Sequence, residues 1–161
     1  MTDKNEFCEN IRLYEKSMYS LAFSIVKNNA DAAEVISESI LRAYKNIQTL
    51  KKADSFKPWI LRIIHNTAVE MIRKNSKIIP IDELNNAVQE SNENEIATNL
   101  TLKSAVEQLR QPYRTIVVLF YYENLSVSKI AQITDSNAVT VKQQLSRARK
   151  MLREALKEDF A

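Results

Sequence analysis

The chain has 161 residues with no glycine and only three prolines, which argues against hairpin-rich sheets and against glycine-dependent phosphate-binding loops. The formal net charge of +3 is too small to indicate nucleic-acid binding by itself. However, residues 76–100 carry one lysine against five acidic residues, so the positive charge lies on either side of that stretch. With 45% hydrophobic residues, we predict an all-α globular protein.

Few residues are available for catalysis or metal binding. Cys8 is the single cysteine and His65 the single histidine, which excludes an intrachain disulfide and multi-cysteine or multi-histidine metal sites. We find no supported carboxylate pair and no nucleophile beside a base. The sequence therefore predicts no enzymatic activity, no cofactor, no metal and no small-molecule substrate.

The sequence shows no targeting or membrane segment. The N-terminus is polar and acidic, unlike a signal peptide. The longest apolar run, Ile116 to Tyr122, is too short to cross a bilayer, and it is more typical of a core segment. We expect a cytoplasmic protein.

Helical periodicity organises the first 75 residues. It predicts one helix over 8–27 and, after an Asn-Asn break, a second helix beginning at Asp31 with acids in its first turns. Residues 48–57 read as a loop. Ser55 is suited to cap a third helix, which extends to about Asn75 and places Trp59 in the core.

Residues 76–98 sustain no helical stripe and are rich in Asn, Glu and Ser, which indicates a flexible acidic linker. The alternative is a short docked helix over 82–88. Beyond it, we predict helices over 100–110 and 112–123, with Pro112 at the start of the second.

The region 126–153 has the spacing of a helix-turn-helix. Ala131 is small enough for close helix crossing, Asp135 tolerates the left-handed dihedrals of the turn, and Val141 packs back against the first helix. Ser126 and Asn137 are suited to cap the two helices. The second helix lacks acidic residues between Thr140 and Arg153.

The buried face of this second helix is predicted to contain Val141, Leu145, Ala148 and Leu152. Its opposite face would lie against duplex DNA. We expect base contacts from four side chains near its start: Thr140, Gln143, Ser146 and Arg147. Three cations are expected to contact phosphates: Lys142, Arg149 and Lys150. The alternative is a cationic helix packed in an ordinary α bundle.

Both halves together resemble the extracytoplasmic-function (ECF) sigma factors of bacterial RNA polymerase. Residues 31–44 (DAAEVISESILRAY) are similar to the DAEDLVQETFLRAW helix of that family, and 56–74 to its FRAWLYRIARNLALDYLRR segment. The second half shows the pattern of sigma domain four in the following positions: Leu109, Tyr113-Arg114, Leu125-Ser126, Ile130-Ala131, Thr140-Val141-Lys142 and Arg147-Ala148-Arg149. The resemblance implies sigma domain two over 1–75, the linker over 76–98 and domain four over 99–161.

The resemblance also implies a set of contacts. The clamp helices of the polymerase's largest subunit would bind Asp31, Glu34, Glu38 and Leu41, although dipole compensation alone would explain the acids. The flap would bind apolar residues of 112–125. The −10 element would contact a loop that holds a flipped base and the helix after it, through Lys51, Lys52, Asp54, Ser55, Phe56, Arg62, Asn66, Arg73 and Lys74.

The chain departs from the family pattern at three positions. Asp135 stands where a glycine is usual, Gln144 where an arginine is usual, and Glu70 where an aspartate is usual. The expected partners are core RNA polymerase, promoter DNA and an anti-sigma factor, often membrane-anchored, which would hold the protein at the membrane. The alternative function is a stand-alone helix-turn-helix regulator that binds duplex DNA without polymerase.

Overall fold

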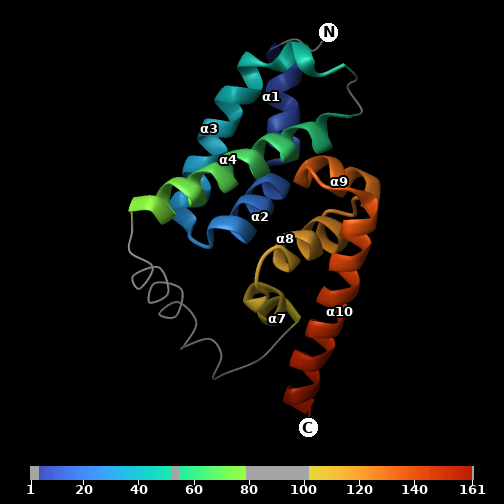
Figure 1. The fold of residues 1–161 in the computed structure, drawn as a ribbon. Helices are drawn as coiled ribbons and strands as arrows, with labels where there is room; N and C mark the ends of the chain where they lie inside the picture. Colours follow the sequence, from blue (N-terminus) through green and yellow to red (C-terminus); the bar gives the residue numbers. More distant parts are fainter. Residues whose placement is uncertain (1–3, 52–54, 79–101, 161) are drawn as a thin grey trace.

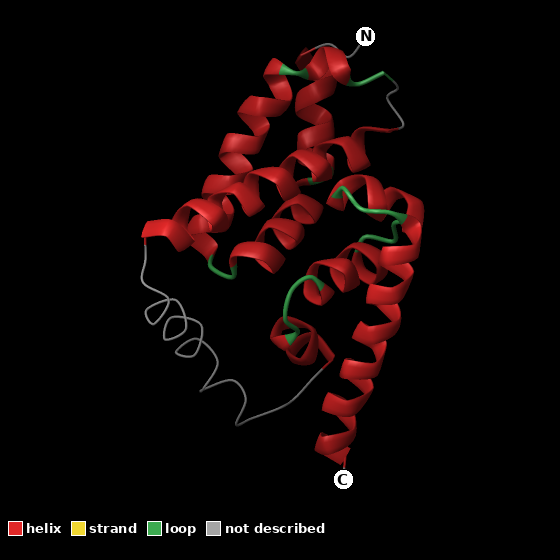
Figure 2. Cartoon of the chain, viewed as in Figure 1, coloured by secondary structure: helices red, strands yellow, loops and turns green. Residues whose placement is uncertain are grey.

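The computed structural model describes residues 4–51, 55–78 and 102–160, and within these ranges it contains helices and no strands (Figures 1 and 2). This confirms the prediction of an all-α protein. The N-terminal half contains α1 (Lys4–Leu13), α2 (Glu15–Val26), α3 (Asn29–Lys45), the short 3-10 helix η1 (Ile47–Thr49) and α4 (Phe56–Ile78). The C-terminal half contains α7 (Leu102–Gln108), α8 (Tyr113–Val117), the π-helical turn η3 (Val118–Tyr122), α9 (Val127–Thr134) and α10 (Ala138–Phe160).

The helix predicted over 8–27 is two helices, because the backbone departs from helical geometry at Tyr14. The Tyr14 ring stacks on Phe56 with 5.9 Å between ring centroids. The break between α2 and α3 occurs where the sequence predicted it. Asn28 caps α3 by accepting a hydrogen bond of 2.7 Å from the backbone N–H of Asp31.

Phe56 belongs to the core, which corrects its predicted place in a base-binding loop. It is the first residue of α4 and only 1% exposed. Its ring packs against Tyr14, edge-on against Phe7, and beside Trp59. Burial of a phenylalanine contributes roughly 1.5–3 kcal/mol to folding, so core packing accounts for this residue.

Trp59 is partly buried against the same core, close to its predicted place. Its indole Nε1 donates a hydrogen bond of 3.1 Å to Thr49 Oγ1, which ties the start of α4 to η1.

The two halves share one continuous hydrophobic core. Helix α9 lies along α4, and α8 lies against α2, as Figure 1 shows. Ile116, Leu119, Ile130 and Ile133 from the C-terminal half are nearly inaccessible to solvent within this core. A second cluster lies inside the C-terminal half, between α7, α8 and α10.

Polar contacts also join the halves at the C-terminal end of α2. The carbonyl of Ser24 accepts hydrogen bonds from Gln111 Nε2, at 2.8 Å, and from Arg114 Nε. The last carbonyls of a helix lack partners within it, so Gln111 and the α8 residue Arg114 supply donors that α2 needs. Arg114 is itself buried and also donates to the Leu109 carbonyl.

A second polar contact joins the start of α4 to the end of η3. Lys57 Nζ donates to the backbone carbonyl of Glu123 at 2.9 Å and lies 3.6 Å from its carboxylate Oε1. The Glu123 side chain is only 8% exposed, so Lys57 neutralises a carboxylate that the interface largely removes from water.

Candidate DNA-binding and polymerase-binding surfaces

The predicted helix-turn-helix is present in α9 and α10. Ser126 Oγ accepts a hydrogen bond from the Lys129 N–H at 3.2 Å, and Asn137 Oδ1 accepts one from the Thr140 N–H at 2.8 Å. Asp135 adopts the left-handed conformation at φ 55°. Ala131 and Val141 are buried between the two helices. The caps, the turn and the packing residues are therefore those that the sequence predicted.

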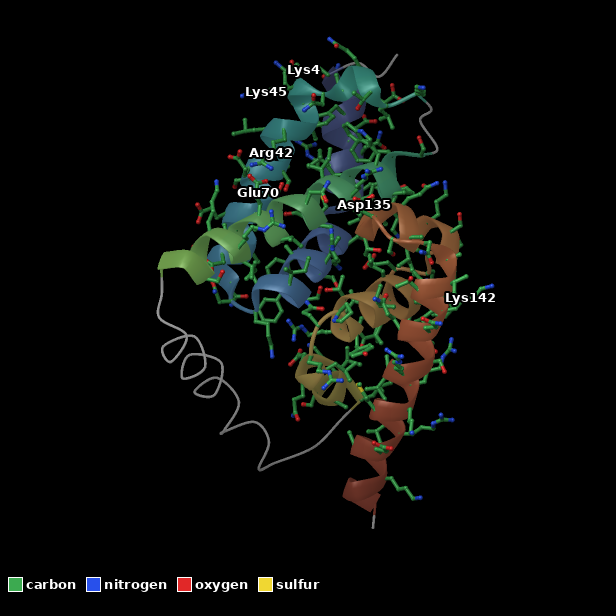
Figure 3. The ribbon with its side chains drawn as sticks, viewed as in Figure 1. Lys4, Arg42, Lys45, Glu70, Asp135 and Lys142 are labelled. Carbon is green, nitrogen blue, oxygen red and sulfur yellow. The ribbon has the colours of Figure 1, made fainter. Side chains whose placement is uncertain are left out.

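The outer face of α10 is polar and cationic. Val141, Leu145, Ala148 and Leu152 are buried, as predicted from their spacing. Most side chains of the predicted −35 set are exposed: Lys142, Gln143, Ser146, Arg147, Arg149 and Lys150. Thr140 is half-buried. Figure 3 shows Lys142 at the outer edge of α10, pointing away from the core. A helix with such an exposed polar and cationic face can enter the major groove of duplex DNA.

Two of these arginines have partners inside the protein. Arg149 Nε donates to the Tyr121 hydroxyl at 2.6 Å, and its guanidinium lies over the Phe120 ring at 5.7 Å. Arg147 and Arg110 lie beside the Tyr113 hydroxyl, and hydrogen bonding to them lowers the pKa of that phenol. Arg149 thus packs at the flank of the face, whereas Gln143 and Lys150 lie at its centre, opposite the buried stripe.

The predicted polymerase-binding residues line one side of α3. Glu34, Glu38 and Leu41 lie at intervals of three and four residues, and therefore share a helix face. Leu41 is 58% exposed, and Tyr44 one turn further along α3 is 50% exposed, so the two form a small apolar patch beside the acids. The face combines acidic and apolar groups.

The acids of this face differ in their local partners. Asp31 accepts a hydrogen bond of 2.6 Å from Asn28 Nδ2 and so belongs to the cap of α3. Glu38 pairs with Arg42 at 3.1 Å, one turn further along. Glu34 is exposed and no hydrogen bond or ion pair is found for it within the described residues. Among these three acids, Glu34 is therefore the most available to form an ion pair with a cation of another protein.

Glu70 has a role that the sequence did not reveal. Its carboxylate receives the Arg42 guanidinium at 2.8 Å, which links α4 to α3 (Figure 3). The Arg42 hydrogen bond lowers the pKa of the Glu70 carboxyl and raises the pKa of Arg42. Lys74, predicted to contact DNA, lies 3.9 Å from the same carboxylate. The longer side chain at position 70 therefore serves a pairing between helices.

The structure separates the predicted −10 residues into groups. Lys51, Arg62 and Asn66 are exposed, and Ser55 is half-buried. Lys51, Ser55 and Arg62 line one cleft of about 260 Å³, together with Trp59 from α4 and Lys129 from α9. Arg73 is exposed further along α4, away from this cleft. Lys52 and Asp54 lie outside the described residues, as does most of the predicted linker.

His65 faces the interface between the halves. It lines a cavity of about 330 Å³ with Gln144 of α10, and its Nδ1 and the Gln144 Oε1 are buried without a hydrogen-bond partner. Burial lowers the pKa of the imidazole, although a hydrogen bond with Asn66 opposes this. His65 is therefore partly buried at the interface between the halves.

In the described ranges, no group of three or more His, Cys, Asp or Glu side chains is placed to hold a metal ion. The helices described there include none that is long and apolar enough to span a membrane.

Family comparisons match both halves of the chain. Residues 11–78 match the family described as Sigma-70 region 2, and residues 99–152 match the family described as Sigma-70, region 4. The chain belongs to the ECF group of the sigma-70 family. Sigma factors of this family are transcription initiation factors and not enzymes.

Two curated relatives of this sigma factor come from Bacillus subtilis. RNA polymerase sigma factor SigV is 34% identical over 92% of this chain and 90% of the relative. ECF RNA polymerase sigma factor SigW is 25% identical over 97% of this chain and 91% of the relative.

Solved structures show the same fold. The sigma factor RpoE of Bartonella quintana, solved with the anti-sigma factor NepR, has a TM-score of 0.73 at 20% identity and covers 94% of this chain and 97% of that one. CnrH, solved with the cytosolic domain of CnrY, has a TM-score of 0.69 at 18% identity and covers 98% of this chain and 91% of that one.

Proposed function

We propose that this sigma factor directs core RNA polymerase to promoters through two surfaces on different halves of the chain. The observation that carries the proposal is the cationic outer face of α10, held by a complete helix-turn-helix on a chain that also bears region 2. Exposed Gln143, Ser146 and Arg147 would read base edges of the −35 element. Lys142 and Lys150 would contact phosphates.

The N-terminal half supplies the other surface. The exposed face of α3, with Glu34 and Leu41, is suited to a basic helical partner, which we assign to the polymerase clamp helices. The cleft at Lys51, Ser55 and Arg62 is suited to a base removed from the stack in the −10 element. Lys129 at the rim of this cleft comes from α9, so α9 must move before a strand follows α4.

We infer that the present packing of the two halves, which we call the closed arrangement, does not serve both promoter elements together. The labels −10 and −35 place the two elements about 25 base pairs apart, which is ~85 Å of duplex at about 3.4 Å per base pair. In the structure α9 lies directly on α4. Promoter recognition therefore requires the halves to separate, with the segment around 76–98 as the connection.

An anti-sigma factor would hold the protein in an inactive form. RpoE was solved with the anti-sigma factor NepR, and CnrH with the cytosolic domain of CnrY. We extend this to a membrane-anchored anti-sigma factor that retains the present chain at the cytoplasmic side of the membrane. The half-exposed Tyr121 and Tyr122 beside Leu102 offer such a partner an apolar surface.

The test is competition between the purified full chain and a housekeeping sigma factor for bacterial core RNA polymerase. We expect the wild type to displace the housekeeping factor and Glu34→Lys to do so more weakly. Glu154→Lys is the matched control, because Glu154 is exposed on α10, away from α3. No displacement by folded protein, together with tight binding to duplex DNA alone, would instead establish the stand-alone regulator.

A further inference from the structure

Residues of α2, α7, α8 and η3 line a cavity of about 380 Å³, which therefore lies between the two halves. Its volume is within the roughly 300–1,000 Å³ of small-molecule sites. It is separate from the α3 face, the outer face of α10 and the cleft at Lys51. The residues that give it chemical character are Tyr19, Phe23, Lys27, Lys103, Arg114 and Tyr122.

Positive charge exceeds negative charge around this cavity. Lys27, Lys103 and Arg114 line it, against the single carboxylate of Glu107. Within the described residues, no carboxylate lies within 4.0 Å of any of the three cations. Arg114 donates to two backbone carbonyls, which leaves its charge unneutralised.

Lys27 is held at the cavity by its backbone. It ends α2 in the left-handed conformation at φ 58°, and its N–H donates to the Phe23 carbonyl. Burial lowers the pKa of its ammonium, the nearby charge of Arg114 lowers it further, and Glu107 opposes both. These effects disfavour the charged form of Lys27. An anion placed between Lys27 and Arg114 would favour that charged form again.

Three aromatic side chains line part of the cavity: Tyr19, Phe23 and Tyr122. The Tyr19 and Phe23 rings stack with 5.8 Å between centroids, and the Tyr19 hydroxyl is hydrogen-bonded to Asn29. Tyr122 lines the cavity from η3 and is 45% exposed. Aromatic faces beside cations are the combination that binds a flat ring carrying a negative group.

We propose that this cavity binds a small aromatic anion with the chemistry of a nucleoside monophosphate. Its phosphate lies among Lys27, Lys103 and Arg114, and its ring lies against Tyr19, Phe23 and Tyr122. Glu107 is placed to accept a hydrogen bond from an amino or hydroxyl group of the same ligand. The occupant is an effector that leaves the site chemically unchanged.

The site is built from both halves, so an occupant favours the closed arrangement by mass action. This consequence rests on the proposed function, since only a promoter-binding sigma factor must open. Binding itself does not depend on that function, because it is measured on the free chain.

The experiment is calorimetric titration of the full chain with adenosine 5′-monophosphate, adenosine and inorganic phosphate in separate runs. We expect the nucleotide to bind at least about tenfold more tightly than either part alone. Lys27→Asn, which keeps a residue suited to left-handed backbone, and Lys103→Gln should each weaken nucleotide binding about tenfold. Lys157→Gln, exposed near the end of α10, is the matched control and should bind as the wild type does.

Three results would overturn the proposal. The first is no nucleotide binding up to about 10 mM. The second is equal binding of phosphate alone, which would remove the aromatic requirement. The third is binding that Arg62→Gln abolishes while Lys27→Asn and Lys103→Gln retain it, which would place the nucleotide in the cleft on α4. None of these results bears on polymerase displacement, so failure here and failure of the sigma function are distinguishable.

Discussion

Asp135 carries the turn of the helix-turn-helix in a conformation that most side chains avoid. A residue with a Cβ in the left-handed region costs roughly 1–2 kcal/mol, and Asp and Asn tolerate it better than others. We expect Asp135→Val to lower the free energy of unfolding by about 1–2 kcal/mol and Asp135→Asn to leave it nearly unchanged. Urea unfolding at neutral pH measures both.

The control for this prediction is Gln132→Val, because Gln132 is exposed in α9 with ordinary helical backbone. That change should cost no more than about 0.7 kcal/mol, the usual span of helix propensities. If Asp135→Val proved no worse than Gln132→Val, the turn would accommodate a β-branched residue without strain.

Arg147 is the strongest candidate for base reading among the arginines of α10. Unlike Arg149, which donates to Tyr121 at the flank, it lies toward the outer face beside the Tyr113 hydroxyl. We expect Arg147→Ala to cost about 1–3 kcal/mol at its preferred −35 base pair and to relax the preference there. Selection of −35 sequences by the holoenzyme from a randomised promoter pool measures this.

Lys142→Ala supplies the comparison, because Lys142 is a predicted phosphate contact on the same helix. It should weaken binding about equally for all sequences and reduce the salt dependence. An Arg147→Ala holoenzyme with an unaltered −35 profile would remove Arg147 from the base-reading residues.

At the scale of helices, local signals in the sequence were sufficient for most ends. Caps need only a side chain and an N–H three residues away, so Asn137 and Ser126 could be assigned from their neighbours. The break at Tyr14 could not, because it accompanies stacking on Phe56, 42 positions later in the sequence. The π-helical turn at 118–122 has no distinguishing pattern in its apolar run.

The predicted site residues also divide into those that local sequence determines and those that depend on distant contacts. Exposure along α10 follows from helical periodicity, and the structure reproduces it. Phe56 was misassigned because an aromatic residue after a loop fits both a base platform and a core. The Arg42–Glu70 pair joins residues 28 positions apart, and nothing local in the sequence marks their meeting.

The pairing of α3 with α4 gives a pH-dependent prediction. Arg42 lowers the pKa of Glu70 in the folded protein, so this pair stabilises the fold above the unfolded pKa of the carboxyl, about 4.5. The stabilisation is lost as the pH falls through the lowered folded pKa. We expect Glu70→Gln to be less stable than the wild type at pH 7, with the difference vanishing in strong acid.

Urea midpoints of the two proteins across this pH range measure the effect. Glu154→Gln on α10 is the control, because Glu154 is exposed and the structure pairs it with no cation among the described residues. A Glu70→Gln difference that stayed constant down to strong acid would show that the carboxylate charge is irrelevant and that only side-chain packing matters.

For the whole molecule, the closed arrangement is the feature that was least predictable from the sequence. The contacts that hold it join residues 66 to 91 positions apart, across a connecting segment whose composition carries no pairing information. The sequence instead suggests two independent domains, because each half has its own helical periodicity. The structure shows that apolar faces of α4 and α9 are buried against each other, and those of α2 and α8 likewise, rather than left to solvent.

The contact between Lys57 and Glu123 offers a direct test of what holds the two halves in the closed arrangement. Loss of the lysine leaves a carboxylate that is 8% exposed without its cation, at a cost of about 1–3 kcal/mol to the closed form. The open fraction should therefore rise about 5- to 150-fold in Lys57→Gln. Dyes on Cys8, which is exposed, and on a cysteine introduced by Lys157→Cys would report lower energy transfer as the halves separate.

The same substitution should strengthen promoter-directed activity at limiting sigma factor, because less free energy is then needed to open the chain. Lys45→Gln is the matched control, since Lys45 is exposed at the end of α3, and Figure 3 shows it away from α9 and α10. Unchanged energy transfer in Lys57→Gln would mean that the shared apolar core alone keeps α9 on α4. In that case a partner that competes for the apolar residues, rather than for Glu123, would be required to open the molecule.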